Sequence, residues 1–517
     1  MTVDRDRYCL AIDLGTGGPK VGFVTLAGGM VWSTHREVKT EFLPHGGAEQ
    51  DAGVWWDVIR DAVREGVNSG AVDASRVAAV SVTGQWASTV PVDANGVPVG
   101  PCVMWMDTRG GRHVRKRIGG PVVGYAPRPI LSFIRKTGGA PSTTGADPIG
   151  HMLYLQEEVP GVHRAARWYL EPVDYLSMRF TGVAAASHAS MTASWLTDNR
   201  ALDRMSYDKG LLKLAGLDAD KLPPLVPTGS VVGTVHTSVA RELGLPDGVQ
   251  VVTGTPDLHT GACGAGAVTD YQTHMAISTT SWISCPVADK KTDAIRQIAT
   301  VPGLSPDRYL IADNHDTSGL AFQWLRDNVV TGLDFNALTA LAADSPAGSG
   351  GVIFTPWLQG ERSPIDDRNA RGGFHNLSIN TTKGDIVRSV LEGVGYNDRW
   401  LHEAVEKFTG RRLDPIRIVG GGAQSDLWCQ IHADVMDRTI ERIAQPYFAQ
   451  LKGAAIFAGL GLGAVTPDEV RGLVELDATF TPSADARGAY DELYSEFPGL
   501  YKAQKDMFKR LNRKKRS

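Results

Sequence analysis

Residues 8–38 read YCLAIDLGTGGPKVGFVTLAGGMVWSTHREV, and this stretch decides the fold. It contains three strand-like runs separated by glycine-rich turns, which is typical of an antiparallel meander. Apolar residues then recur at helical spacing over 52–67, where the pattern is carried by Trp55, Trp56, Ile59, Val63 and Val67. The apolar run RVAAVSVTGQ at 76–85 predicts a buried strand after that helix. Strands, helix and strand in this order indicate a mixed α/β layer fold.

A similar order of elements returns in the second half of the chain. Its strand-like runs and one long amphipathic segment lie at 273–287, 309–316, 385–407 and 415–419. A chain of 517 residues also exceeds what one hydrophobic core usually serves. We therefore expect two related α/β lobes, a first domain at 1–267 and a second at 268–517, with a ligand cleft between them.

Three stretches fall outside this pattern. Residues 116–150 and 218–230 are rich in glycine and proline, and we expect each to be a loop or an insertion. The basic tail at 502–517 is expected to be the solvated, frayed end of a terminal helix.

Composition narrows the classes of partner. With 53 basic and 57 acidic residues the net charge is −4, which provides no global field for nucleic acid or an anionic membrane. The five cysteines are scattered without a Cys-x-x-Cys pair, so we expect buried, reduced thiols. The first ten residues, MTVDRDRYCL, lack the apolar region of a signal peptide. We expect a cytoplasmic protein that acts on a small molecule, with neither a nucleic-acid nor a membrane partner.

The turn inside the opening meander could hold an anion. Asp13, Gly15, Thr16 and Lys20 lie between two predicted strands. Glycines let backbone N–H groups approach a phosphate, while Asp13 could hold a metal ion and Lys20 adds positive charge. A tight hairpin turn explains the same residues. No Gly-Lys dipeptide occurs in the chain, so a Walker-type P-loop is excluded.

Three later stretches can be interpreted in the same way. The run STTS at 278–281 supplies hydroxyls between two strands, TSGLAFQWLRD places Gly319 and Gln323 at the start of a helix, and IVGGGAQSDLWCQ leads from a strand through three glycines into another helix. Helix N-termini favour negatively charged groups. Each stretch alone is explained by a turn or a cap, but together they favour a phosphate or nucleotide site.

The stretch VVTGTPDLHTGACGAGAV at 251–268 presents one acid, Asp257, with few groups nearby in sequence that could neutralise it. Taken alone, Asp257 is interpreted as a turn residue before a small-residue helix.

The order of motifs along the chain resembles the FGGY carbohydrate kinases, above all the xylulokinase-like members. The resemblance spans about residues 8–465 and is carried by DLGTGGPK, SVTGQ, VMWMDTR, GTPDLHTGACGAGAV, LQGERSPIDDRNARGGFHNL, VLEGVGY, GGGAQSDLWCQIHADVM and LKGAAIFAGLGLG. It implies two RNase H-like (actin-like) ATPase lobes that close over sugar and ATP. It also implies that Asp257 is the catalytic base that accepts the proton of the attacking sugar hydroxyl, a role that suits phosphoryl transfer. Dimers are common among such kinases, so a homodimer is an expectation.

The same resemblance implies the nucleotide-binding residues. Asp13, Gly15 and Thr16 would meet the ATP phosphates and Mg²⁺, and Thr279 would face the phosphates from the second lobe. Mg²⁺ would be carried largely by ATP and water, with Asp13 as its protein ligand. The positions around the nucleotide would be Gly319, Gln323, Gly421, Gly422 and Asp426.

The sugar end departs from the family pattern. Relatives carry Gln-Met-His or Gln-Arg-Glu where this chain has Gln85, Trp86 and Ala87. Alanine cannot hydrogen-bond a hydroxyl, and Trp86 offers one N–H and an apolar face, so the substrate is left open. The other expected substrate neighbours, each of which could equally be a core aromatic or a turn acid, are Trp105, Asp107 and Trp282.

Three phosphate-side positions also depart from the pattern, namely Gly18, Ser278 and Leu258. These departures motivate an alternative, a catalytically weak or inactive sensor that binds sugar and nucleotide. A filament-forming or chaperone ATPase shares the lobes but has no use for the GERSP motif at 360–364. The expected function is ATP-dependent phosphorylation of a sugar or polyol.

Overall fold

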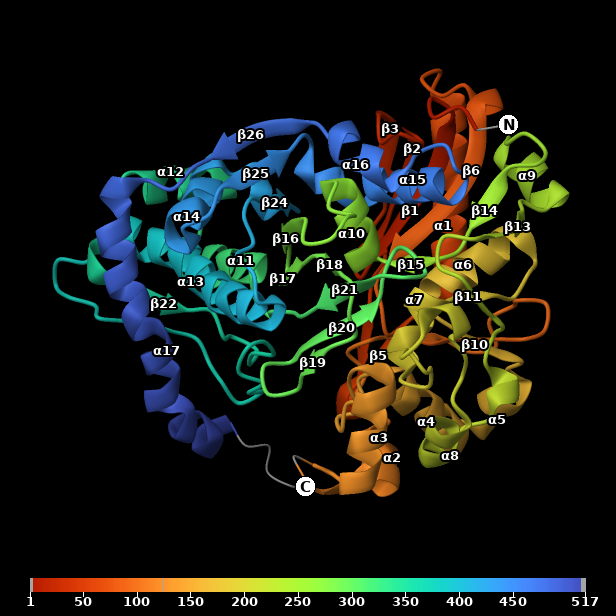
Figure 1. Ribbon diagram of the computed structural model, residues 1–517, viewed down its shortest axis with the longest axis horizontal. Helices are drawn as coiled ribbons and strands as arrows, with labels where there is room; N and C mark the ends of the chain where they lie inside the picture. Colours follow the sequence, from red (N-terminus) through yellow and green to blue (C-terminus); the bar gives the residue numbers. More distant parts are fainter. Residues whose placement is uncertain (1–2, 123, 513–517) are drawn as a thin grey trace.

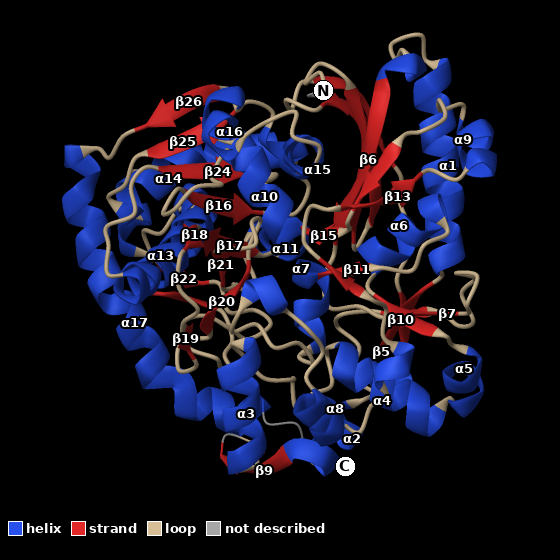
Figure 2. Cartoon of the chain, turned by 45° about the vertical axis from the view of Figure 1, so that its right-hand side comes forward, coloured by secondary structure: helices blue, strands red, loops and turns tan. Residues whose placement is uncertain are grey.

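The computed structural model describes residues 3–122 and 124–512. It contains two main sheets, one in each half of the chain, with helices on both faces of each (Figures 1 and 2). The prediction of a mixed α/β protein with two related lobes is confirmed.

The first sheet has the strand order β13-β14-β6-β1-β2-β3. Its meander is formed by β1 (Tyr8–Gly15), β2 (Gly18–Thr25) and β3 (Met30–His35), which pair antiparallel as predicted. Strand β6 (Val77–Gly84) runs parallel to β1, and β14 (Gln250–Val252) runs parallel to β6. The edge strand opposite β3 is β13 (Val231–Thr234), and the short β15 (Thr255–Pro256) pairs with the end of β6.

Alternating side chains of this sheet enter two different cores. Leu10 and Ile12 pack with helix α1 (Ala52–Asn68) and helix α6 (Pro172–Thr181), whereas Cys9 and Ala11 pack with helix α15 (Ala449–Gly461). This alternation follows from the two-residue period of a strand. The predicted helix over 52–67 is thus confirmed as α1.

The second sheet has the order β17-β16-β24-β25-β26. Strands β16 (Thr273–Ile277), β24 (Ile416–Val419) and β25 (Ile440–Ile443) are parallel, and β17 (Ser281–Ser284) and β26 (Leu476–Phe480) are antiparallel edges. Its helices include α11 (Gly319–Asn328), α12 (Phe335–Ala343), α13 (Lys383–Thr409), α14 (Asp426–Met436) and the terminal α17 (Ala484–Asn512).

A smaller sheet of this lobe has the order β18-β21-β20-β19. Its strands are β18 (Pro286–Val287), β21 (Tyr309–Ala312), β20 (Ile298–Pro302) and β19 (Thr292–Asp293).

Two helices lie between the main sheets: α10 (Asp257–Ala265) contacts β16 and β24, while α15 crosses from the C-terminal part of the chain onto β1, β2 and β6 (Figures 1 and 2). They approach backbone to backbone, because a Cβ on Gly453 would lie 1.8 Å from the Thr260 carbonyl oxygen. Thr260 also bonds the Thr83 hydroxyl at 2.7 Å and so ties α10 to β6. The first residue of α10, Asp257, therefore has a fixed position beside the first sheet.

Residues 116–150 form an insertion, as expected, but much of it is helical rather than loop. Helices α2 (Gly111–Ile118), α3 (Pro127–Thr137) and α4 (Pro148–Glu158) pack with α8 (Lys209–Ala215) around a separate small core. Pro127 and Pro129 stand in the first turn of α3 and Pro148 in that of α4, and Gly138 ends α3. Here proline and glycine delimit helices, which is why their abundance suggested a loop.

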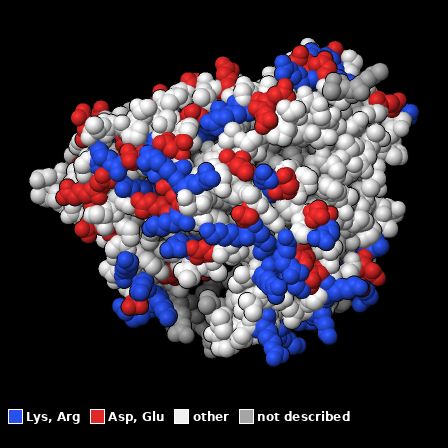
Figure 3. Space-filling view, in the orientation of Figure 1, with Lys and Arg blue, Asp and Glu red and all other residues white. Residues whose placement is uncertain are grey.

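The surface carries both signs of charge. On the face in Figure 3, Lys and Arg gather in a band across the middle, with Asp and Glu beside them. Among residues 3–122 and 124–512, no helix combines the length and the apolar character needed to cross a bilayer. All five cysteines are free and buried, as expected.

Candidate active site

Asp257 lies where the ends of three strands of the first sheet meet. It follows β15, whose Pro256 pairs with Gly84 at the end of β6, and Leu14 of β1 pairs with the same glycine. Asp13 on β1 and Gln85 after β6 are therefore brought to the same edge of the sheet. The sequence prediction grouped these residues only through the resemblance, and the strand register supplies the physical reason.

The environment of Asp257 disfavours its ionised form. Burial is the main cause and the negative charge of Asp13 is the second, and together they raise the pKa of Asp257 to about 7. Lys20 opposes this shift weakly. Within the described part of the chain, no side chain forms an ion pair with Asp257. A carboxylate that is partly ionised at neutral pH, and not held by a cation, can accept a proton.

Asp13 and Lys20 form the charged part of the first loop. They are cross-strand partners on β1 and β2, with Lys20 Nζ 3.0 Å from Asp13 Oδ2. The negative charge of Asp13 raises the pKa of Lys20, so the ammonium stays charged. It also lies 4.7 Å from the ring centre of Tyr447. The loop therefore presents a positive charge beside the carboxylates.

The glycine at position 18 is required by the turn. Its φ is +124°, and a Cβ there would lie 2.1 Å from the Arg36 carbonyl oxygen. A serine in this backbone conformation would be strained and would clash, which explains this departure from the family pattern. The Thr16 hydroxyl accepts from Trp105 Nε1 at 3.1 Å, and the Thr16 carbonyl accepts from Gln50 Nε2 at 2.8 Å.

The second loop, residues 278–281, connects β16 to β17 and lies against the start of α11. Gly319 N donates to the Ser278 carbonyl at 2.7 Å, and Ser318 N donates to the Thr279 carbonyl at 3.0 Å. A Cβ on Gly319 would lie 2.4 Å from that Ser278 oxygen, so only glycine permits this approach. Thr279 itself is exposed at the tip. Two of the predicted nucleotide segments thus form one structural unit.

The third segment joins them at the carboxyl ends of β16 and β24, which pair in parallel up to Ala276 and Val419. Gly420 N donates to the Pro446 carbonyl at 3.0 Å, and a Cβ on Gly421 would meet nothing within 4 Å, which leaves room for a flat group. Asp426 begins α14, is exposed, and pairs with Arg442 at 2.5 Å. Gln323 is exposed one turn after Gly319 on α11.

At the predicted sugar end, Gln85 and Trp86 differ in the hydrogen bonds that they can still offer. Gln85 is 6% exposed, and neither its amide oxygen nor its amide nitrogen has a partner in the described residues. Trp86 Nε1 already donates to the Ser190 carbonyl at 2.7 Å, so it offers only its apolar face. Trp105 bonds Thr16 and so links this region to the first phosphate loop.

Two predicted substrate neighbours are occupied by protein contacts. Asp107 is 1% exposed, and its carboxylate accepts from Ala48 N at 2.8 Å and from the guanidinium of Arg109 at 2.6 Å. Trp282 is 8% exposed, donates to His274 Nε2 at 3.3 Å and lies beside Gly261 of α10. A direct contact of either side chain with substrate stays a prediction.

Sequence analysis missed two buried acids next to the predicted sugar end, Glu171 and Asp174. Glu171 Oε2 accepts from Ser88 N at 3.2 Å, next to Ala87, and its Oε1 has no partner among the described residues. Burial, followed by the charge of Asp174, raises the pKa of Glu171 well above its usual range. Glu171 lies 83 positions from Ser88, and no local pattern in the sequence marks it.

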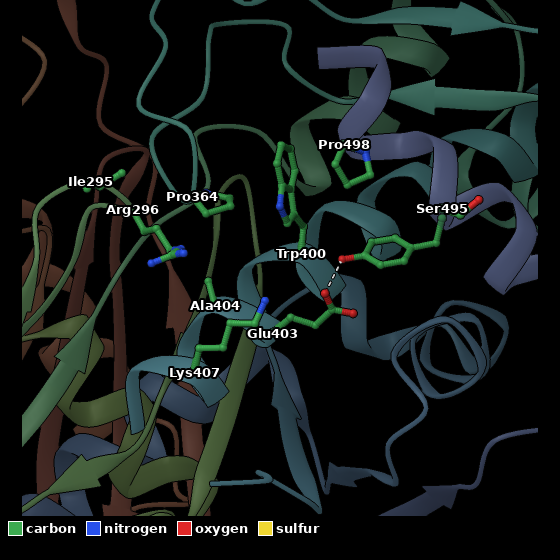
Figure 4. Close-up of a pocket in the computed structure, with 10 residues that line it drawn as sticks. Ile295, Arg296, Pro364, Trp400, Glu403, Ala404, Lys407, Ser495 and Pro498 are labelled. Carbon is green, nitrogen blue, oxygen red and sulfur yellow. Dashed lines mark hydrogen bonds between the residues drawn. The ribbon is translucent and has the colours of Figure 1, made fainter. Parts of the chain in front are cut away.

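A pocket of about 390 Å³ lies elsewhere, on the outer side of the second lobe between α13 and α17 (Figure 4). Trp400 forms one wall, and Tyr494 donates a 2.9 Å hydrogen bond to Glu403. None of the predicted site residues lines this pocket. The described residues contain no cluster of three or more His, Cys, Asp or Glu that could hold a metal ion by itself.

Comparisons with known proteins agree with this geometry. Residues 8–264 match the N-terminal domain of the FGGY family of carbohydrate kinases, and residues 273–462 match its C-terminal domain. A xylulose kinase of Staphylococcus epidermidis is 30% identical over 504 residues, covering 96% of this chain and 97% of the relative. A gluconokinase of Bacillus subtilis is 24% identical, covering 84% of each chain.

Solved structures share the fold. The ligand-bound xylulose kinase from Lactobacillus acidophilus superposes with a TM-score of 0.86 at 22% identity, covering 97% of this chain and 99% of that one. The xylulose kinase from Rhodospirillum rubrum has a TM-score of 0.82 at 26% identity, covering 97% and 100%. Nothing in these relatives favours the sensor alternative. With both family domains matched in order and relatives covered over nearly their full length, the chain belongs to the FGGY family of carbohydrate kinases.

Proposed function

We propose that this carbohydrate kinase uses Asp257 as the general base for phosphoryl transfer from ATP to a hydroxyl of a sugar or polyol. The observation that carries the proposal is a carboxyl group with a pKa of about 7, without a cationic partner in the described residues, at the edge where Asp13 and Gln85 also lie. Asp257 accepts the hydroxyl proton, and the oxygen attacks the γ-phosphorus as the bond to ADP breaks.

We assign the ATP phosphates to the space between the first loop, which joins β1 and β2, and the second loop, which joins β16 and β17. The first loop contributes Gly15, Thr16 and the ammonium of Lys20, and the second contributes Thr279 and the N-terminus of α11. The base of the nucleotide is assigned to the space beside Gly421, Gly422 and Asp426.

The residues present fit a magnesium ion that keeps most of its water. Asp13 offers its second oxygen, Oδ1, because Lys20 engages only Oδ2. One carboxylate and no larger ligand cluster in the described residues matches the preference of Mg²⁺ for water and phosphate oxygens. When bound, Mg²⁺ neutralises charge on the phosphates. The 3.0 Å bond from Lys20 holds the Asp13 carboxylate in position for this role.

The division into domains is proposed at 1–267 and 268–517, with Asp257 at the end of the first. The separate main sheets and the two matched family domains support it. Helices α10 and α15 then form the contact about which the lobes close, and closure excludes water that would otherwise hydrolyse ATP.

A pentulose such as xylulose, or a related ketose or polyol, is proposed as the substrate. The support is the 30% identity to a xylulose kinase. Trp86 offers a face without a free N–H, and Ala87 offers no hydrogen bond, so the site recognises fewer hydroxyls than a Gln-Met-His or Gln-Arg-Glu site does.

The test is ADP release, measured with a coupled assay across pentuloses, hexuloses, pentitols, tetritols and glycerol. At least one of these sugars or polyols should stimulate ADP release well above the rate with ATP alone. If nucleotide binds but no compound in the panel stimulates release, the proposed reaction is wrong.

A further inference from the structure

The second phosphate loop stands on a buried polar cluster that the proposed chemistry does not use. The cluster consists of Ser281, His315, Asp398 and His432, and all four side chains are at most 1% exposed. They come from β17, from the loop before α11, from α13 and from α14. The elements that carry the proposed phosphate and nucleotide residues therefore meet at one point.

Asp398 is the centre of this cluster. Its Oδ1 accepts from Ser281 Oγ at 2.9 Å and lies 3.0 Å from His315 Nδ1. Its Oδ2 lies 3.0 Å from His432 Nε2. Burial alone would raise the pKa of Asp398, but the bonds from His315 and His432 hold it well below its usual range. The carboxylate is thus ionised and hydrogen-bonded on both oxygens.

The protons of the two imidazoles follow from their partners. His432 Nδ1 lies 2.8 Å from the Trp428 carbonyl, which can only accept, so this nitrogen carries a proton. Its Nε2 is the ring nitrogen that faces Asp398 Oδ2, 3.0 Å away. For His315, burial opposes the charged ring, but Glu361, Asp398 and Asp313 raise its pKa to about 9. His315 is therefore charged at neutral pH, and its link to Asp398 is charge-assisted.

The cluster connects directly to the loop backbone. His315 N donates to the Ser281 carbonyl at 2.8 Å. A few residues further along the chain, Ser318 N and Gly319 N donate to the carbonyls of Thr279 and Ser278. On the other side, His432 lies in α14, which begins at Asp426 beside the space assigned to the base. A shift of Asp398 would move the phosphate side and the base side of the ATP site together.

We propose that Asp398, acting through Ser281, His315 and His432, is a positioning residue for ATP that holds the loop 278–281 and helix α14 in the geometry that receives the nucleotide. The inference rests on the proposed placement of the phosphates at Thr279. Asp398 itself touches neither substrate in this arrangement.

The test is Asp398→Asn in the full chain, with ADP affinity measured by calorimetry and KM measured for ATP and for the sugar. Loss of a charge-assisted bond predicts ADP affinity and ATP KM worse by about tenfold, with the sugar KM within about twofold. Ser281→Ala removes one bond to Asp398 and should weaken ADP binding in the same direction, by about threefold.

His402→Gln is the matched control, because His402 is also buried in α13, one turn after Asp398, but bonds the Leu413 carbonyl. It should lower the melting temperature without changing ADP affinity.

The groups that face His315 are Asp398, His432, Glu361, Asp313 and Ser281. Since its charged form is lost as pH rises through about 9, native ATP KM should rise there, and the Asp398→Asn variant should lose this limb.

Unchanged ADP affinity in Asp398→Asn, with a melting temperature lowered as in His402→Gln, overturns the inference. If Asp398→Asn fails to fold, the test passes to Ser281→Ala and His315→Gln. Unchanged ADP affinity in both of these variants then also overturns the inference. Thr279→Asp separates the two proposals, since a carboxylate at the phosphate position should abolish tight ATP binding. Unchanged ATP binding in Thr279→Asp would refute the phosphate placement, and this inference with it.

Discussion

We predict that the rate of sugar phosphorylation falls at acid pH, because Asp257 must be ionised to act as the base. With a pKa of about 7, the ionised fraction of Asp257 is about 90% at pH 8 and about a tenth at pH 6. We therefore expect kcat/KM for the sugar, at saturating ATP, to fall roughly tenfold from pH 8 to pH 6, and about tenfold per further pH unit below that. A carboxylate with the ordinary aspartate pKa of 3.8 would leave the rate flat over this range.

The assay needs a control for other groups that titrate in the same range. Burial also raises the pKa of Asp313, in the second lobe, to about 7. Asp313→Asn should keep the acid limb, and ADP affinity of the native protein should not fall between pH 8 and pH 6. A flat rate down to pH 6, or an acid limb that disappears in Asp313→Asn, would refute the assignment of the limb to Asp257.

Two further substitutions test the framework around the site. Gly453→Ala places a Cβ 1.8 Å from the Thr260 oxygen, so it should separate α10 from α15. The free energy of unfolding, measured with denaturant, should fall by about 3 kcal/mol and turnover should decrease, whereas unchanged stability would contradict this packing. Trp86→Phe keeps the apolar face but leaves the Ser190 carbonyl without its 2.7 Å donor. The sugar KM should therefore rise severalfold while the ATP KM stays unchanged. An equal change in both KM values would place Trp86 outside the sugar site.

The elements with the strongest local patterns were predictable from sequence. The meander at the N-terminus and helix α1 follow from strand alternation and from apolar residues at helical spacing, and both match the structure. The helices of the insertion at 116–150 were harder to predict, because proline in a first turn and glycine at a helix end give the same composition as a loop. Only the contacts with α8 show that these helices pack.

The site was predictable only in part. Glycine-rich turns marked the segments proposed to bind the nucleotide, and the ends of parallel strands bring two of them together. The hydrogen bonds that occupy Asp107 and the Trp86 N–H join residues 59 and 104 positions apart, which no local pattern encodes. The same holds for the cluster around Asp398, whose partners Ser281 and His432 are 117 and 34 positions away.

The most direct test of the account is turnover by Asp257→Asn. The amide cannot accept the hydroxyl proton, so sugar-dependent ADP release should fall ~10²-fold or more while ADP affinity stays native. The variant should melt at or above the native temperature at pH 8, because it removes a partly buried carboxylate whose ionised form is disfavoured by the charge of Asp13. Turnover within a few-fold of the native rate would show that Asp257 is not the base.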